Sequence, residues 1–301
     1  MKYPKSFVAL ALFIFFFSTC DSDSDVYPDS NVNELKGFGI YMVADTISYN
    51  DLISDTSKIN VIPEPLISYQ DINYYELSSL SLRLNKYLDI TAKMFRPYII
   101  VNDGQIASIG QFLLSPCCVL PYTDRLLFLA RDNGLTNVVT VSRNQNEMIQ
   151  SLLPADKIKT DIIVHIDSFN VVGSDSAGID ISLVNNTEED LYLLDPSKTP
   201  DFYQTGHEMD ILVNDYMTWG ESVLQAIDLY PRSIENYRLV RPDDTLSLVL
   251  DQRAVKIMDL IRVGKENNIR FYYDNCTYPI DQYPIWTGKI FHSQTVEIME
   301  K

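Results

Sequence analysis

The chain has 301 residues, 46% of them hydrophobic and 22% charged, which is typical of a globular protein with enough material for two domains. Its formal net charge of −17 disfavours nucleic acid as a partner, because an acidic body repels phosphate backbones. The same charge repels anionic headgroups, so we expect contact with a membrane only through an attached lipid.

The first segment has the order of a secretory signal. Lys2 and Lys5 precede an apolar run from Phe7 to Phe17, and small residues follow at once. The run of about 11 residues fits the ~7–15 of a signal-peptide core and is shorter than the ~20 that span a bilayer. We therefore predict a signal peptide at residues 1–19. Two alternatives stay open: an uncleaved anchor helix, and a signal peptide cut nearby that leaves Cys20 as an ordinary thiol.

The segment Phe17-Ser18-Thr19-Cys20 resembles the lipobox of bacterial lipoproteins. The resemblance implies that Cys20 becomes the mature N-terminus and carries acyl chains, of which several together anchor a protein stably. The run that contains Asp21, Asp23 and Asp25 resembles the surface-export signal of Bacteroidota lipoproteins. By composition alone it is also a solvated, disordered tether, since clustered Asp and Ser form no core. We expect a lipidated acidic tether at residues 20–35 and an outer-membrane lipoprotein exposed on the cell surface.

The next segments mix strand and helix patterns. Apolar spacing predicts helices at 86–95 and 144–153, each followed by a proline, and the polar residues at 50–58 predict a short helix or loop. Asp103-Gly104 between two apolar runs predicts a hairpin with a type I′ turn, because Gly tolerates positive φ. Aromatic, β-branched or alternating runs predict strands at 38–43, 80–84, 98–101, 126–129 and 138–141. Together these elements predict an α+β domain.

Part of this domain has a family resemblance. Residues 64–72, the strand at 80–84 and the run from 98 through Asp103-Gly104 to 109 resemble the extracytoplasmic head subdomain of the protein-export protein SecD. The resemblance implies a ferredoxin-like βα fold, and we expect it over residues 36–156. It does not imply protein translocation, because a shared fold does not carry a function.

After Asp161 the pattern changes to short strands separated by turn residues. Strands are expected at 162–166, 178–184, 191–194, 245–250, 269–273, 286–291 and 294–298. This pattern favours an antiparallel sandwich over residues 157–301. Segments 181–186, 242–250, 264–273 and 286–291 resemble immunoglobulin-like accessory domains of Bacteroidota lipoproteins. The resemblance implies binding, spacing or assembly, and no chemistry.

No motif in the sequence predicts catalysis, a metal site or a cofactor. His207 begins a zincin-like motif, but Ile211 stands where the second histidine is needed. The other histidines, His165 and His292, fall in or near predicted strands, where structural or surface roles are more common. No nucleophile elbow, dinucleotide loop or Walker loop is present. We therefore expect no enzyme, and assign no catalytic, metal-binding or cofactor-binding residue.

The four cysteines do not predict a disulfide framework, because three remain if Cys20 carries lipid. Cys117 and Cys118 are adjacent, and two half-buried thiols are favoured over a strained vicinal disulfide. The 19 tyrosines are most simply explained by packing on sheets, where aromatic residues are common. The alternative is that some of them form a face that contacts a protein or a sugar.

The sequence thus predicts an α+β, ferredoxin-like domain followed by an all-β immunoglobulin-like sandwich. The leading functional hypothesis is a cell-envelope lipoprotein that acts as a non-enzymatic binding or assembly module for an unknown envelope protein or glycan. Two alternatives are an envelope hydrolase with an unrecognised carboxylate pair and a proteinase-inhibitor-like sandwich.

Overall fold

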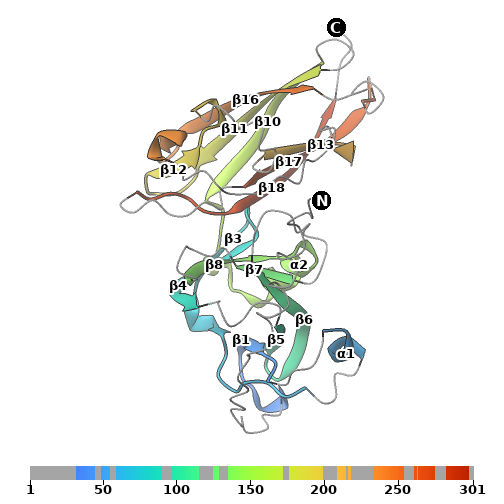
Figure 1. Ribbon diagram of the computed structural model, residues 1–301, viewed down its shortest axis with the longest axis vertical. Coiled ribbons are helices and arrows are strands. Elements are labelled where there is room, and N and C mark those ends of the chain that lie inside the picture. The colour runs from blue at the N-terminus through green and yellow to red at the C-terminus, as the bar shows by residue number, and fades with distance from the viewer. Residues whose placement is uncertain are drawn as a thin grey trace, which may run out of the picture.

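The computed structural model describes residues 32–44, 49–54, 59–89, 96–114, 125–128, 135–171, 176–198, 209–214, 216–217, 233–253, 261–262, 264–274 and 283–297. These residues form two modules that follow each other along the length of the molecule (Figure 1). They are mostly β-structure in several sheets, with two α-helices. The predicted fold class, a ferredoxin-like α+β domain followed by an immunoglobulin-like sandwich, is therefore wrong.

The first module is one nine-stranded sheet in the order β2-β1-β5-β6-β7-β8-β4-β3-β9. Neighbouring strands are antiparallel except the pairs β6–β7 and β3–β9, which are parallel. The strands are β1 (Phe38–Met42), β2 (Ile67–Ser68), β3 (Ile72–Glu76), β4 (Ser81–Asp89), β5 (Pro97–Asn102), β6 (Gln105–Leu114), β7 (Arg125–Phe128), β8 (Leu135–Val141) and β9 (Ile158–Lys159). The helices are α1 (Tyr49–Ser54) and α2 (Arg143–Leu152).

Two hydrophobic clusters cover the two faces of this sheet. On β1 and β5, Ile40 and Tyr98 belong to the cluster that includes Ile149 of α2. Tyr41 and Ile99, one position further along each strand, belong to the cluster that includes Leu52 of α1. Successive side chains of a strand point to opposite faces. Both central strands are thus buried on both faces, which explains their continuous apolar sequence.

The hairpin and the second helix agree with the sequence predictions. β5 and β6 pair antiparallel through Asp103 and Gly104, whose φ values are 48° and 77°, as a type I′ turn requires. Helix α2 covers most of the predicted helix and ends before Pro154. Its buried Gln145 receives a hydrogen bond from the Tyr98 hydroxyl at 3.0 Å and donates one to Ser108 at 2.6 Å.

The helix predicted at 86–95 is wrong where the structure describes it. Residues 86–89 continue β4, in which Leu82, Leu84 and Leu88 are buried and Asn85 is exposed. Lys86 lies at the position where the next inward apolar residue would stand, and it forms an ion pair with Asp71 at 2.8 Å. The interruption hid the period-two pattern, and the apolar spacing that remained resembled that of a helix.

The second module contains three sheets. Their orders are β10-β11-β16, β12-β15 and β14-β13-β17-β18, and every pair is antiparallel. The strands are β10 (Ile162–Val171), β11 (Ser176–Asn185), β12 (Leu191–Leu194), β13 (Met209–Val213), β14 (Tyr216–Met217), β15 (Tyr237–Val240), β16 (Thr245–Arg253), β17 (Glu266–Asp274) and β18 (Lys289–Glu297). Short 3₁₀ turns occur in both modules, at Val32–Glu34, Tyr69–Asp71, Ala155–Lys157, Pro196–Lys198 and Ile234–Asn236.

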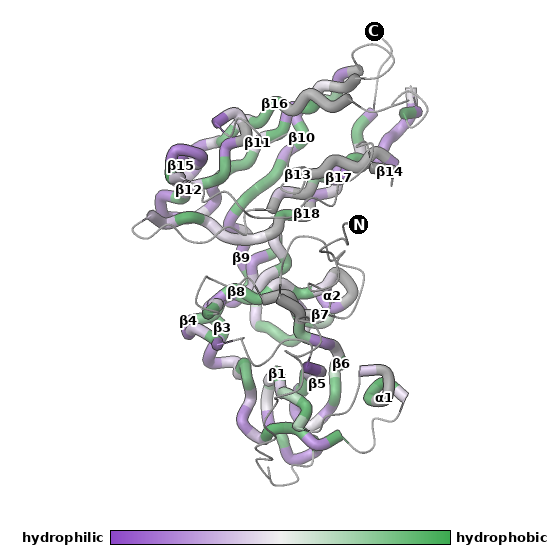
Figure 2. The backbone as a smooth tube through the Cα atoms, in the orientation of Figure 1, coloured by the Kyte–Doolittle hydropathy of each residue, from purple (hydrophilic) through white to green (hydrophobic). Residues whose placement is uncertain are grey.

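One hydrophobic core joins the sheets of the second module. It contains Ile166 and Leu183 from the β10-β11-β16 sheet, Leu193 from β12, and Phe271 and Ile290 from the four-stranded sheet. Hydrophobic stretches run along β10 and β11 (Figure 2). The two strands predicted at 286–291 and 294–298 are one strand, β18, and Trp286 precedes it.

Candidate functional site: the buried junction of the modules

The tight turn between β3 and β4 supplies most of the groups at the junction. β3 ends at Glu76, residues 77–80 form the turn, and β4 begins at Ser81. Leu80 has a φ of 49°, a backbone conformation that is uncommon for a residue other than glycine. The turn is fixed from the side of β9 by a hydrogen bond from the Leu77 amide to the Lys159 carbonyl at 2.8 Å. The hairpin therefore meets the chain at the point where it leaves the first module.

The carboxylate of Glu76 is fully buried and accepts five hydrogen bonds. Oε1 accepts from the amide and hydroxyl of Ser78, at 3.0 and 2.6 Å, and from the Asp161 amide at 2.9 Å. Oε2 accepts from the Ser79 amide at 2.6 Å and from the Ser79 hydroxyl. A buried carboxylate is tolerated when its lone pairs are matched by donors in this way.

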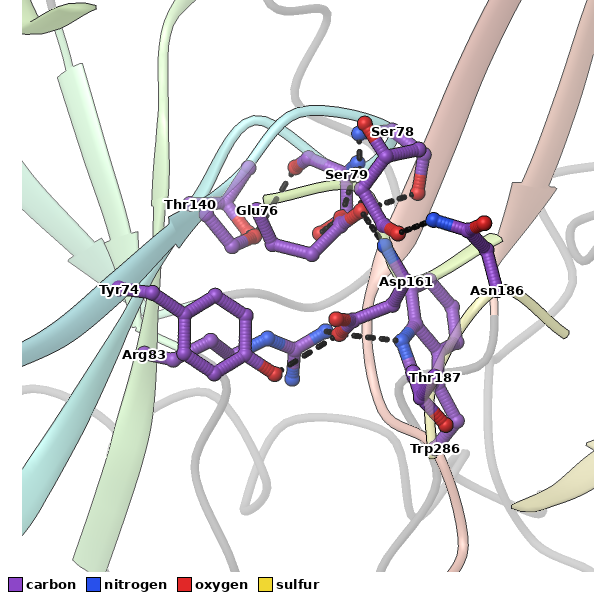
Figure 3. A network of polar contacts seen from close by, with 12 residues as sticks. Tyr74, Glu76, Ser78, Ser79, Arg83, Thr140, Asp161, Asn186, Thr187 and Trp286 are labelled. Carbon is purple, nitrogen blue, oxygen red and sulfur yellow. Dashed lines mark hydrogen bonds and ion pairs between the residues drawn. The ribbon is translucent and has the colours of Figure 1, made fainter. Parts of the chain in front are cut away.

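Asp161 is the second buried carboxylate and lies where the second module begins. Its Oδ2 accepts from the Tyr74 hydroxyl at 2.9 Å and from the Trp286 indole N–H at 3.2 Å. Both side chains point to this carboxylate from opposite modules (Figure 3). Its backbone carbonyl accepts from the Asn186 amide at 2.8 Å. Asp161 thus joins β3 of the first module to two other segments of the second, those that contain Asn186 and Trp286.

Arg83 of β4 completes the junction. Its Nη2 lies 3.9 Å from Oδ2 of Asp161, and its guanidinium carbon lies 5.2 Å from the centre of the Trp286 ring. Nε and Nη2 of Arg83 are buried and have no hydrogen-bond partner among the described residues. The cation is therefore held mainly by the Asp161 charge and the face of the indole ring.

Gly288 allows the second module to approach this closely. A Cβ atom at Gly288 would lie 2.7 Å from Cη2 of Trp286 and 3.0 Å from Cβ of Ser79. Both distances are shorter than ordinary carbon–carbon contacts. We call the set Tyr74, Glu76, Ser78, Ser79, Arg83, Asp161 and Trp286 the junction network.

Burial sets the protonation behaviour of the network. It raises the pKa of Asp161, and although Arg83 acts in the opposite direction, the nearby Glu76 charge adds to the increase. Burial also raises the pKa of Tyr74, and the negative charge of Asp161 contributes further. Tyr74 therefore stays protonated at neutral pH, and its hydroxyl donates a hydrogen bond to Asp161.

This geometry fits a structural joint better than a reactive site. A catalytic carboxylate has to present an oxygen to its substrate, whereas both Glu76 oxygens are occupied by donors of the protein itself. In the described part of the chain, no group of three or more His, Cys, Asp and Glu side chains could hold a metal ion. No helix in that part is long and apolar enough to span a bilayer.

The residues singled out in the sequence do not belong to the junction. Cys20, Asp21, Asp23 and Asp25 lie outside the described residues, as do Cys117, Cys118, His207 and Cys276. His165 lies exposed on β10. His292 lies on β18, its Nε2 is 3.4 Å from Oε1 of Gln294, and burial lowers its pKa.

Sequence reasoning missed the whole junction network. The signal that was present is local: an acid followed by Leu77-Ser78-Ser79 is a pattern in which serine hydroxyls and turn amides can satisfy a carboxylate. Arg83, Asp161 and Trp286 carried no comparable signal, because their positions in the sequence are far apart.

Comparison with known proteins adds no family to this description. A scan against models of protein families finds no match, and a search of curated proteins finds no relative of this chain.

Proposed function

We propose that the chain is a cell-envelope lipoprotein whose folded body is a non-enzymatic module that binds or assembles a protein or a glycan. Lipid on Cys20 holds the body at the outer membrane, and Asp21, Asp23 and Asp25 direct it to the cell surface. The support for the anchor is in the sequence: basic residues, a short apolar run and a cysteine follow one another in the order of a lipoprotein signal.

The observation that carries the proposal for the body is the junction network. Separating the modules would leave Asp161 without Tyr74 and Glu76 without the Asp161 amide. Leaving buried charged groups unmatched is strongly unfavourable. The two modules should therefore move as one body, which suits a protein that presents a binding surface on a rigid support.

The anchor is tested by comparing the wild-type protein with a Cys20→Ala variant in the host. We expect the mature wild-type chain to begin at residue 20 with the added mass of acyl chains, and to be digested by protease added to whole cells. Cys20→Ala should lack the added mass and leave the membrane fraction. A Cys276→Ala variant is the matched control and should keep both properties. An unmodified, soluble wild-type chain would contradict the anchor.

The non-enzymatic role is tested separately on the purified chain. We expect no turnover of envelope polysaccharides, peptides or esters. Turnover that is lost in Glu76→Gln or Asp161→Asn, while circular dichroism shows that the variant is folded, would replace this role with a hydrolase.

A further inference from the structure

The first described residues are held at the turn between β5 and β6. Residues Val32–Glu34 form a 3₁₀ turn beside it, and the Asn33 carbonyl oxygen lies 2.8 Å from the position that a Cβ atom would take at Gly104. The Gly37 amide donates to Oδ1 of Asp103 at 2.9 Å, and the Asp103 amide donates to the Gly37 carbonyl at 3.1 Å. Only a glycine at position 104 permits so close an approach of the two backbones.

Apolar contacts fix the same segment. Val32 and Leu35 pack against the hydrophobic cluster that contains Tyr41 of β1 and Ile99 of β5. The Leu35 amide donates to the Val32 carbonyl at 3.1 Å and closes the short turn. The described chain therefore enters the folded body at one defined place, the β5–β6 turn.

This turn lies at the end of the first module that is remote from the second. β6 pairs with β5 from Gln105 to Gln111 and with β7 from Gln111 to Leu114, so the turn is at the end of β6 opposite to its contact with β7. Five strands separate β1 from β3 in the sheet order. Figure 1 shows β1, β5 and α1 at the far end of the first module and β3 next to the second module.

The junction network holds the second module at the opposite end. The Tyr74 hydroxyl donates to Asp161, the Asp161 amide donates to Glu76, and the guanidinium of Arg83 lies over the Trp286 ring. Folding the second module back toward the β5–β6 turn would separate these buried partners, which is strongly unfavourable. The chain entry and the second module therefore stay at opposite ends of one body.

We propose that the β5–β6 end of the first module faces the membrane, and that the second module is the membrane-distal end, which an extracellular partner meets first. The inference rests on the lipid at Cys20 proposed above and adds which end of the body that lipid holds. Val32 is 12 positions after Cys20, and a chain of that length spans at most about 40 Å. The β5–β6 turn therefore stays within this distance of the lipid.

Two effects direct the second module away from the bilayer. Charged side chains are costly to bring into hydrocarbon, so orientations that swing a charged body into the bilayer are excluded. The net charge of −17 also repels anionic headgroups. A rigid body that is held by one end beside such a surface points its other end outward.

Energy transfer from the protein to the membrane surface tests this orientation. The lipidated full chain is reconstituted into vesicles that contain a lipid with an acceptor dye on its headgroup. A donor dye is coupled to p-azidophenylalanine, which replaces one residue in each protein: Glu34 beside the β5–β6 turn, Ile53 on α1 or Val249 on β16. Ile53 and Val249 are a matched pair, because both are exposed apolar residues, at 52% and 66%, and they lie at opposite ends of the molecule (Figure 1).

We expect transfer from positions 34 and 53 to exceed transfer from position 249 severalfold, because energy transfer falls steeply with distance. Flotation of the vesicles shows in the same samples whether the protein is anchored. A chain that floats but transfers equally from positions 53 and 249, or more strongly from 249, would overturn the orientation and leave the anchor intact. A chain that does not float would overturn the anchor, and the orientation with it.

Discussion

The carboxylate of Glu76 accepts a hydrogen bond from the backbone amide of Asp161 at 2.9 Å, although the two residues are 85 positions apart in the chain. One residue ends a strand of the first module, and the other begins the second module. Because this contact is buried and accompanied by four further bonds to the same carboxylate, the joint between the modules should contribute strongly to the stability of both.

Replacing Glu76 by glutamine should destabilise the protein by about 3 kcal/mol, since the bonds of a buried charged acceptor are lost or weakened. In the wild type, amide and hydroxyl donors bind both carboxylate oxygens of Glu76. The NH₂ group of glutamine would replace one of these oxygens, so donors would face a donor. The free energy of unfolding from urea titrations measures the effect. Glu235→Gln, at an exposed position, is the control and should change it by less than about 0.5 kcal/mol. Equal effects of the two substitutions would show that the Glu76 bonds are not stabilising.

The pH dependence of stability should report the raised pKa of Asp161. A carboxyl group whose pKa is raised by folding contributes stability that is fully present below its unfolded value of about 3.9 and is lost as pH rises through the folded value. The stability of the wild type minus that of Asp161→Asn should therefore fall as pH rises from about 4 toward neutral.

Asp71 behaves in the opposite way and does not disturb this comparison. Burial acts to raise its pKa, but hydrogen bonds from Lys86 and Ser68 lower it overall. Its contribution is present above its unfolded pKa and is lost as pH falls through the folded value, equally in both proteins. A wild-type advantage over Asp161→Asn that grows with pH would mean that attraction to Arg83 outweighs burial.

Gly288→Ala should destabilise the junction by about 1–3 kcal/mol, because the added methyl group would overlap the Trp286 ring and press on Ser79. Tryptophan fluorescence and thermal unfolding together measure the change and show whether Trp286 has moved. Gly264→Ala is the contrasting variant: it has a φ of 67° but no atom within 4 Å of its Cβ position, so it should cost about 1 kcal/mol through the backbone alone. An unchanged fluorescence and stability in Gly288→Ala would contradict the close approach.

Arg83 and Asp161 should behave as a coupled pair. Arg83→Met alone leaves a buried carboxylate without its cation and should cost about 3 kcal/mol or more. In the double variant Arg83→Met/Asp161→Asn no unmatched charge remains, so the loss should be smaller than the sum of the two single losses by about 1–3 kcal/mol. Unfolding free energies of all four proteins give this coupling. Additive losses would show that the 3.9 Å contact contributes nothing.

Local patterns predicted the elements whose signals lie within a few residues. The hairpin at Asp103-Gly104 and the helix that became α2 were both correct, because turn chemistry and helical spacing act over short distances. β4 shows the limit, since Lys86 in an inward position made a strand resemble a helix. The strands β13 and β15 were also missed. In β15, Tyr237 and Val240 are buried and the two residues between them are exposed, so no period-two pattern marks the strand.

The sequence by itself determined the acidic charge, the lipoprotein-like start, the hairpin and α2, all of which depend on residues adjacent in the chain. Only the tertiary structure decided the order of the nine-stranded sheet and the junction network. Pairing of distant segments depends on the whole set of competing contacts and on the entropy of closing long loops. The role of the buried Glu76 cannot be predicted from its neighbours in the sequence alone, because Asp161, 85 positions away, supplies one of the amides that it binds.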